Sequence, residues 1–217
     1  MSQELVPLVV VLAKAPVAGR SKTRLSPPCT PCAAAAVARA SLFDTLAAVE
    51  TWGGKRVLAL DPCGTDFAVD GWDVIGQPDG GLDVRLEGVF AELFERHDGS
   101  VFLVGMDTPQ IEAADIAAAF SALETADAVI GPAVDGGFWC IGFRAWAKGA
   151  FVDVPMSVDS TYAEQYARLI SLGLTVAFLR ELSDLDTFDD AVRVGASAPQ
   201  TRTGTLVGQP SWWTLAT

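Results

Sequence analysis

The chain has 217 residues, a length that suits one domain, and half of them are hydrophobic, enough to form a sizeable core. Its formal net charge of −12 disfavours nucleic acids and anionic membrane surfaces as partners. No apolar run approaches the ~20 residues that a membrane-spanning helix needs, so we expect no membrane insertion. Four cysteines and the absence of a signal-peptide pattern fit a reducing compartment, and we therefore expect a cytoplasmic protein.

Buried apolar runs alternate along the chain with segments of helical periodicity. We expect strands at residues 7–13, 56–60, 72–75, 101–104, 126–130, 138–143 and 174–179, and helices at 33–50, 82–96, 113–123, 160–172 and, as the last one, 189–194. This alternation predicts an α/β sandwich with a mainly parallel sheet, in which strand 138–143 could return as a hairpin arm. We expect residues 1–195 to form one domain and residues 196–217 a C-terminal tail, whose Trp212 and Trp213 pack back on the domain.

The loop after the first strand concentrates positive charge. It carries Lys14, Arg20, Lys22 and Arg24, and no acidic residue occurs between residues 5 and 43. In a strongly acidic chain this concentration predicts a bound polyanion, most simply the phosphates of a nucleotide. A solvated charge cluster is the alternative. Since the P-loop and GxGxxG patterns are both absent, the phosphates would be bound by these side chains and by nearby backbone N–H groups.

Three acidic loops are expected at the same edge of the sheet, because ligands of parallel α/β sheets bind beyond the carboxyl ends of the strands. Asp107 ends a strand, and it either holds a divalent cation against phosphate oxygens or caps the next helix. Asp184 and Asp186 have the same two interpretations, as a second metal ligand or as a helix cap. The segment Asp135-Gly136-Gly137 lets the backbone approach a ligand closely, forms a hairpin turn, or does both.

Cys29 and Cys32 form a CxxC pattern at the expected start of the first helix. A redox pair is one interpretation, because a helix N-terminus lowers the pKa of a thiol. A zinc site is a weaker interpretation, because no second ligand pair lies at a suitable spacing. We favour a third interpretation, in which both cysteines are small residues of a loop-to-helix turn.

Five stretches, taken together and in this order, resemble one known family. They are Ala13-Lys14-Ala15-Pro16 with Gly19-Arg20 and Lys22-Thr23-Arg24-Leu25; Gln77 with Gly80-Gly81-Leu82 and Arg85-Leu86; Gly105-Met106-Asp107-Thr108-Pro109; Gly131-Pro132-Ala133 with Asp135-Gly136-Gly137-Phe138 and Ile141-Gly142; and Asp184-Leu185-Asp186-Thr187. In them the chain is similar to bacterial GT-A-like (SpsA-like) nucleotide-diphospho-sugar transferases, glycosyltransferases that include an arsenosugar-biosynthesis type. More distantly it resembles 2-phospho-L-lactate guanylyltransferase.

The resemblance implies a GT-A-like three-layer sandwich that binds a nucleotide at the loop after the first strand, together with a Mg²⁺ or Mn²⁺ ion. The implied metal ligands are Asp107 and Asp186, with Asp184 in reserve, and the implied catalytic residues are Arg20, Lys22 and Asp107. The implied nucleotide-binding residues are Lys14, Ala15, Gly19, Arg20, Lys22, Arg24, Gln77, Gly80 and Gly81. The implied acceptor-binding residues are Asp135, Gly136, Gly137 and Ser157.

These observations predict a metal-dependent transferase that uses an activated nucleotide and a small-molecule acceptor. A nucleotide-diphospho-sugar donor would make the protein a glycosyltransferase, which the resemblance favours. The abundance of cations favours an alternative, a guanylyltransferase-like nucleotidyltransferase that acts on a phosphorylated small molecule. A second alternative is a nucleotide-binding protein without catalytic activity. A homodimer is also possible.

Overall fold

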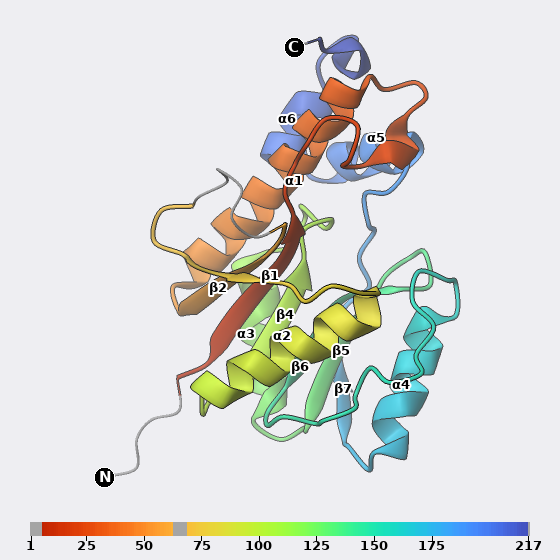
Figure 1. Cartoon of the computed structure of the whole chain (residues 1–217). Coiled ribbons are helices and arrows are strands. Elements are labelled where there is room, and N and C mark those ends of the chain that lie inside the picture. Colours follow the sequence, from red (N-terminus) through yellow and green to blue (C-terminus); the bar gives the residue numbers. More distant parts are fainter. Residues whose placement is uncertain (1–5, 63–68, 217) are drawn as a thin grey trace.

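The computed structural model describes residues 6–62 and 69–216, so Cys63 lies outside the described residues. The described chain forms a seven-stranded sheet in the order β3-β2-β1-β4-β6-β5-β7 (Figure 1). The strands are β1 (Leu8–Lys14), β2 (Lys55–Asp61), β3 (Asp73–Gly76), β4 (Val101–Gly105), β5 (Ala128–Pro132), β6 (Phe138–Phe143) and β7 (Val176–Phe178). The helices are α1 (Pro31–Trp52), α2 (Leu82–Arg96), α3 (Ala113–Leu123), α4 (Thr161–Ser171), α5 (Phe188–Ser197) and α6 (Arg202–Val207), with short 3₁₀ turns η1 (Thr23–Leu25) and η2 (Trp212–Thr214).

The sheet is parallel except at β6. Strand β1 pairs in parallel with both β2 and β4, whereas β6 runs antiparallel to β4 and β5. This arrangement confirms the expected mainly parallel α/β sheet and the hairpin arm at residues 138–143. Because the carboxyl ends of β1, β2 and β4 meet at one edge, the loops that follow them are brought together there.

Helices cover both faces of the sheet, which makes three layers (Figure 1). Successive residues of β1 point to opposite faces, so Val9 and Val11 pack in the core under α1 and α3. Leu8 and Val10 pack in the second core, which α2 and α4 cover. The continuous Val run of β1 is therefore explained by burial of the strand on both sides.

The C-terminal residues form structure that the sequence analysis did not predict. The expected last helix is longer than residues 189–194, and a further helix, α6, packs against α1 and α5. Trp212 is buried and stacks on Phe188 at a centroid distance of 5.3 Å, as expected for a tail that packs on the domain. The polar, Gly-rich composition of this segment did not predict α6, because the first turn of the helix is stabilised by a side chain distant in the sequence, Asp44 of α1.

Replacement of Asp44 by Ala is expected to lower the free energy of unfolding by about 3 kcal/mol. The buried Asp44 carboxylate accepts hydrogen bonds from the backbone N–H of Arg202 at 2.8 Å and from the N–H and hydroxyl of Thr203 at 2.9 and 2.8 Å. Without the carboxylate these buried donors lose their partners. Urea denaturation would measure the loss, with Asp98→Ala, an exposed carboxylate, as control. A loss no larger than that of the control would contradict the role of Asp44.

Helix α1 corrects one expectation from the sequence. Its 22 residues are long and apolar enough to cross a membrane by length and composition, although no such run was expected. In the fold α1 contacts β1, α3 and α6 and contains buried Ser41, Asp44 and Thr45. Its apolar composition is thus explained by its place as a core helix under the sheet.

The CxxC cysteines lie at the start of α1, as we favoured. The hydroxyl of Thr30 caps the helix by accepting the Ala33 N–H at 3.1 Å, and Cys32 falls in the first turn. Cys29 is buried, and burial raises the pKa of its thiol. Both thiols are free, and a raised pKa opposes the reactive thiolate that a redox pair requires.

Candidate active site

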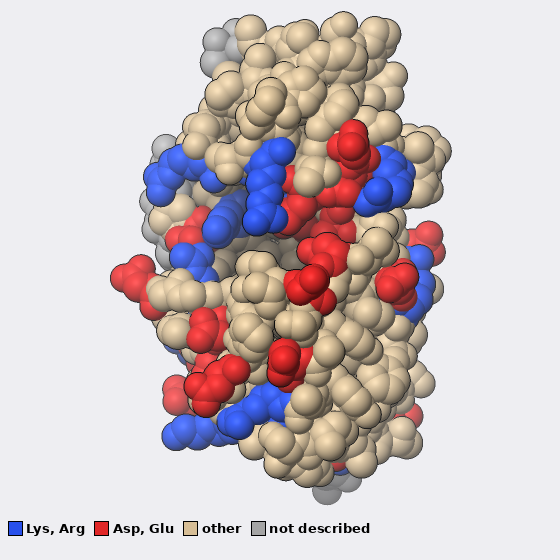
Figure 2. Space-filling view, turned by 90° about the vertical axis from the view of Figure 1, so that its right-hand side faces the viewer, with Lys and Arg blue, Asp and Glu red and all other residues tan. Residues whose placement is uncertain are grey.

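A cleft of about 760 Å³ lies at the carboxyl edge of the sheet. Figure 2 shows a hollow with Lys and Arg side chains gathered on one side and Asp and Glu side chains on the other. Two walls of opposite charge line the cleft. We call them the cationic wall, formed by Lys14, Arg20, Lys22, Arg24 and Arg85, and the acidic wall, formed by Asp107, Asp135, Asp159, Asp184 and Asp186.

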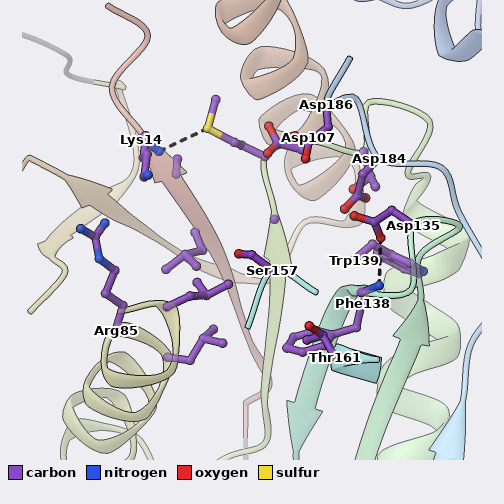
Figure 3. A pocket seen from close by; sticks show the side chains of 18 of the residues that line it. Lys14, Arg85, Asp107, Asp135, Phe138, Trp139, Ser157, Thr161, Asp184 and Asp186 are labelled. Carbon is purple, nitrogen blue, oxygen red and sulfur yellow. Dashed lines mark hydrogen bonds between the residues drawn. The ribbon is translucent and has the colours of Figure 1, made fainter. Parts of the chain in front are cut away.

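The two walls come from different parts of the chain. Among the described residues that line the cleft, those between 12 and 86 include no acid, and those between 103 and 186 include no Lys, Arg or His. In the close view, Lys14 and Arg85 lie on one side of the pocket, opposite Asp107, Asp184 and Asp135 (Figure 3). The cleft can therefore bind an anion on the side of Lys14 and Arg85, away from these carboxylates.

A network of local hydrogen bonds shapes the cationic loop. The hydroxyl of the buried Ser21 accepts the Val17 N–H at 2.8 Å and donates to the Ala15 carbonyl at 3.0 Å. Gly19 and Lys22 both adopt left-handed backbone conformations, with φ of 75° and 49°. The resulting tight turn leaves the exposed Arg20 on the cleft surface and directs Lys22 inward. Ser21 was missed by the sequence analysis, because a single serine carries no pattern of its own.

Lys22 connects the two walls. Its Nζ lies 2.8 Å from Asp107 Oδ2 and 2.9 Å from Asp186 Oδ1, and its side chain is only 8% exposed. Burial alone would lower the pKa of Lys22, but the two carboxylates outweigh it and raise the pKa above its ordinary value. Arg24 adds a more exposed contact to Asp186 at 3.4 Å. The sequence placed these residues at one edge of the sheet, and the structure shows that they are in contact.

The acidic wall contains carboxylate oxygens suited to a divalent cation. Oδ1 of Asp107 and Oδ1 of Asp184 are buried and have no hydrogen-bond partner among the described residues. Carboxylate oxygens are the ligands that Mg²⁺ and Mn²⁺ prefer, and a buried charged oxygen requires a partner. The residues therefore fit such an ion, although no group of three or more His, Cys, Asp or Glu among residues 6–62 and 69–216 is arranged as a preformed metal site. Asp186, the expected second ligand, directs both its oxygens to Lys22 and Arg24.

The carboxyl of Asp184 makes the stability of the metal-free protein depend on pH. Burial, followed by the negative charges of Asp107 and Asp135, raises its pKa to about 7. The folded protein therefore binds this proton more tightly than the unfolded chain does. The protonated carboxyl thus makes its full contribution to stability below pH 4, and that contribution is lost as the pH rises through 7. Over that interval we expect the free energy of unfolding to fall by about 4 kcal/mol. Denaturation in EDTA between pH 4 and 8 would measure it, and Asp184→Asn should flatten the curve; an equally steep curve would contradict the assignment.

Gln77, beside the cationic wall, and Arg85, within it, make contacts that the sequence did not reveal. Nε2 of Gln77 donates to the carbonyls of Ala13 and Ala59, both at 2.8 Å, so this side chain braces the ends of β1 and β2 instead of presenting its N–H groups to a ligand. Arg85 in the first turn of α2 pairs with Asp61 and donates to the Gly80 carbonyl at 3.0 Å. Arg85 stood in one of the family stretches but was not among the expected site residues, and the structure adds it as a further cation of the cleft.

The Asp135–Gly137 loop packs tightly against the segment before α4. Gly136 has a φ of 88°, and a Cβ atom on it would lie 2.1 Å from the carbonyl oxygen of Asp159. The Gly136 carbonyl accepts the Tyr162 N–H at 2.8 Å, and Oδ1 of Asp135 accepts the Gly137 N–H at 2.9 Å. The hairpin turn and the close backbone approach, which the sequence left open, therefore coexist, but the close approach is to the protein's own backbone.

Replacement of Gly136 by Ala is expected to lower the free energy of unfolding by about 3 kcal/mol or more, because backbone strain and a backbone clash add. Gly19→Ala is the matched control, since Gly19 also has a positive φ, of 75°, but open space where the Cβ would lie. Strain alone should cost the control about 1 kcal/mol. Equal losses for the two variants in urea denaturation would show that the contact with Asp159 is unimportant.

Most of the expected site residues line this one cleft. These are Lys14, Arg20, Lys22, Arg24, Gln77, Gly80, Asp107, Asp135, Gly137, Ser157, Asp184 and Asp186. Ala15, Gly19, Gly81 and Gly136 lie in the same loops but are not part of the lining. Ser157 has a left-handed backbone, and Thr161 holds its loop by donating to the Pro155 carbonyl at 2.9 Å and accepting the Val158 N–H at 3.1 Å. Their roles as ligands of substrate or metal stay predictions.

The three layers, the strand order and the cleft at the carboxyl edge define a protein with the nucleotide-diphospho-sugar transferase-like fold. The chain belongs to a family described as uncharacterized proteins conserved in bacteria (DUF2064), whose sequence profile matches residues 45–158. That stretch includes Asp107, Asp135 and Ser157, but neither the cationic loop nor Asp186. No functionally curated protein matches the chain.

Several solved structures have a fold similar to that of this chain. A protein of Desulfovibrio desulfuricans G20, provisionally named a nucleotide-diphospho-sugar transferase, matches with a TM-score of 0.85 and 23% identity over 93% of this chain and 94% of its own. Rv0371c of Mycobacterium tuberculosis H37Rv, in complex with manganese, matches with a TM-score of 0.54 and 22% identity over 88% and 98% of the two chains. The 2-C-methyl-D-erythritol 4-phosphate cytidylyltransferase of Thermus thermophilus matches with a TM-score of 0.52 and 19% identity over 90% and 99%. These likenesses establish the fold, which transferases and nucleotidyltransferases share.

Proposed function

We propose that this protein is a metal-dependent glycosyltransferase that uses a nucleotide-diphospho-sugar as donor and a hydroxyl compound as acceptor. The observation that carries the proposal is the division of one cleft into a cationic wall and an acidic wall. A donor diphosphate needs cations, and a hydroxyl that must lose a proton is served by carboxylates. The provisional name of the structure from Desulfovibrio desulfuricans supports the same donor class.

The cationic wall would bind the donor phosphates. Lys14 and Arg20 are exposed and form no ion pair with a described residue, so both are free to contact phosphate oxygens. Arg85 is already oriented by Asp61 and Gly80 at the other end of the wall. As the glycosidic phosphate bond breaks, negative charge grows on the leaving diphosphate, and these cations stabilise it where it develops.

In the transfer step one bond forms, one bond breaks and one proton moves to a carboxylate of the cleft. The oxygen of the acceptor hydroxyl forms a bond to the anomeric carbon of the sugar, and the bond from that carbon to the phosphate oxygen breaks. The electron pair of the broken bond stays on the departing nucleoside diphosphate. The hydroxyl proton passes to Asp135, whose Oδ1 is oriented by the Gly137 N–H and whose Oδ2 remains available.

Asp107 and Asp184, with their unpartnered buried oxygens, would hold Mg²⁺ or Mn²⁺, and Asp186 would position Lys22 and Arg24 beside it. Such an ion supplies a Lewis acid for the diphosphate leaving group. The manganese complex of Rv0371c supports the choice of ion.

Nucleotidyl transfer is a second candidate, and the size of the cationic wall favours it. Lys14 and Arg20 form no ion pair with a described residue, and the three other cations of the wall add positive charge that suits a nucleoside triphosphate better than a diphosphate. Structural neighbours include a synthetase complexed with CTP. In this reaction an acceptor oxygen would attack the α-phosphorus and diphosphate would leave. A phosphorylated acceptor would then have to approach the acidic wall, which is why we place this candidate second.

The test is a thermal-shift panel of nucleoside triphosphates and nucleotide sugars with Mn²⁺, followed by product analysis with the nucleotide that stabilises most. Saturating binders stabilise a folded protein by a few kcal/mol, which such a panel detects. Release of a nucleoside diphosphate indicates glycosyl transfer, and release of diphosphate indicates nucleotidyl transfer. Arg20→Met should lose the shift while Lys148→Met, an exposed cation outside the cleft, keeps it. A panel without any shift would reject both candidates.

A further inference from the structure

The acidic wall holds more negative charge than the protein itself neutralises. Asp107 and Asp186 are paired with Lys22, and Asp186 also with Arg24. Asp135, Asp159 and Asp184 form no ion pair with any described residue. Because Asp184 is assigned to the metal ion in the proposed function, Asp135 and Asp159 are the two carboxylates of the wall that are left without a neutralising partner among the described residues.

A polar group in the same wall also lacks a partner. Thr108 is 1% exposed and lines the cleft, and its Oγ1 forms no hydrogen bond with a described residue. A buried hydroxyl without a partner costs free energy unless a ligand or water satisfies it. The wall therefore has the features of a binding surface, with charge to be neutralised and a hydroxyl to be satisfied.

We propose that the acceptor of the transfer carries a protonated amine beside its reactive hydroxyl and bears no phosphate. This inference rests on the proposed function and names the substrate class of its acceptor side. The ammonium group would be held by the carboxylates of Asp135 and Asp159, which both line the cleft. Asp135 lies on the side of the pocket opposite Lys14 and Arg85 (Figure 3).

The charge arrangement explains why an anionic acceptor is rejected. A phosphate placed against carboxylates is repelled, because like charges brought together at a binding surface weaken the affinity. On the cationic wall the same phosphate would compete with the donor. An ammonium group instead neutralises the acidic wall and leaves the cationic wall to the donor diphosphate.

The test measures charge preference with the donor side filled. The whole protein is loaded with Mn²⁺ and inorganic diphosphate, and titration calorimetry at low salt compares glucosamine, glucose and glucose 6-phosphate. A second matched set is ethanolamine, ethylene glycol and 2-hydroxyethyl phosphate. We expect the amine of each set to bind at least about tenfold more tightly than its neutral counterpart, and the phosphate to bind most weakly.

The double variant Asp135→Asn, Asp159→Asn should bring the amine to the affinity of the neutral compound, while Asp153→Asn, an exposed residue outside the cleft, keeps the preference. Equal affinities within both sets, no binding of either amine, or tighter binding of the phosphates would overturn the proposal. Failure of diphosphate and Mn²⁺ to bind at all would instead contradict the proposed function, and the acceptor assignment would fall with it. The loading step thus separates the two failures.

Discussion

Replacement of Asp107 by Asn is expected to reduce kcat/KM by about a thousandfold, or about 4 kcal/mol in the transition state, because a metal ligand is lost. Asp107 lies two residues after the end of β4 at Gly105, and its Oδ1 is buried without a partner among the described residues, while its Oδ2 contacts Lys22. The amide is nearly isosteric, so the fold should persist with Lys22 still paired to Asp186. Steady-state kinetics, and the thermal shift caused by nucleotide with Mn²⁺, would both measure the loss.

The control for Asp107 is Asp98→Asn, an exposed carboxylate outside the cleft. The control should keep both the activity and the metal-dependent shift. Should Asp107→Asn still respond to Mn²⁺ with nucleotide as the unchanged protein does, Asp107 would not be a metal ligand. Loss of the fold would show in its circular dichroism spectrum, and Asp107→Glu, which keeps the charge, would then provide the readout through its altered Mn²⁺ affinity.

Replacement of Lys22 by Met is expected to weaken nucleotide binding, because one charge of the cationic wall is lost, and, in EDTA, to lower the free energy of unfolding by about 3 kcal/mol. The variant leaves Asp107 and Asp186 facing each other without the ammonium group that lies 2.8 and 2.9 Å from them. Mn²⁺ alone should therefore stabilise the variant more than it stabilises the unchanged protein, in which Lys22 already neutralises the pair. Urea denaturation with and without Mn²⁺ would measure both effects.

Lys14→Met serves as the matched control for Lys22, since Lys14 lines the same cleft and forms no ion pair with a described residue. It should weaken nucleotide binding but leave stability and the response to Mn²⁺ unchanged. An identical response of Lys22→Met and Lys14→Met to Mn²⁺ would mean that the ammonium of Lys22 and the metal do not share the carboxylates.

Much of the fold could be predicted because its elements are locally encoded. The periodic spacing of apolar residues predicted α2 and α3 with their observed bounds, Leu82–Arg96 and Ala113–Leu123, and the apolar run Phe138–Phe143 is strand β6 as expected. Helix α6 was not predicted because the contacts that stabilise it come from outside its own segment. Asp44 is distant in the sequence, and α5 is a separate helix. Local composition carries no information about such partners.

The candidate site was predicted only as a set of loops. Their convergence follows from a general property of parallel sheets, that ligands bind beyond the carboxyl ends of the strands. Which side chains touch was not predictable, because the contact of Lys22 with Asp186 spans 164 residues of sequence. Gln77 illustrates the limit: its position at the site was expected, but its amide donates to β1 and β2 rather than to the cleft.

The sequence by itself determined the class of the fold, the cationic loop at its first strand and the acidic residues that follow later strands, because burial patterns and charge are local properties. Only the tertiary structure decided that Lys22 bridges two carboxylates, that Arg85 completes the cationic wall and that Asp135, Asp159 and Asp184 remain unpaired among the described residues. The reason is physical: ion pairing and desolvation depend on distances between atoms, which exist only after the sheet has brought remote segments to one edge.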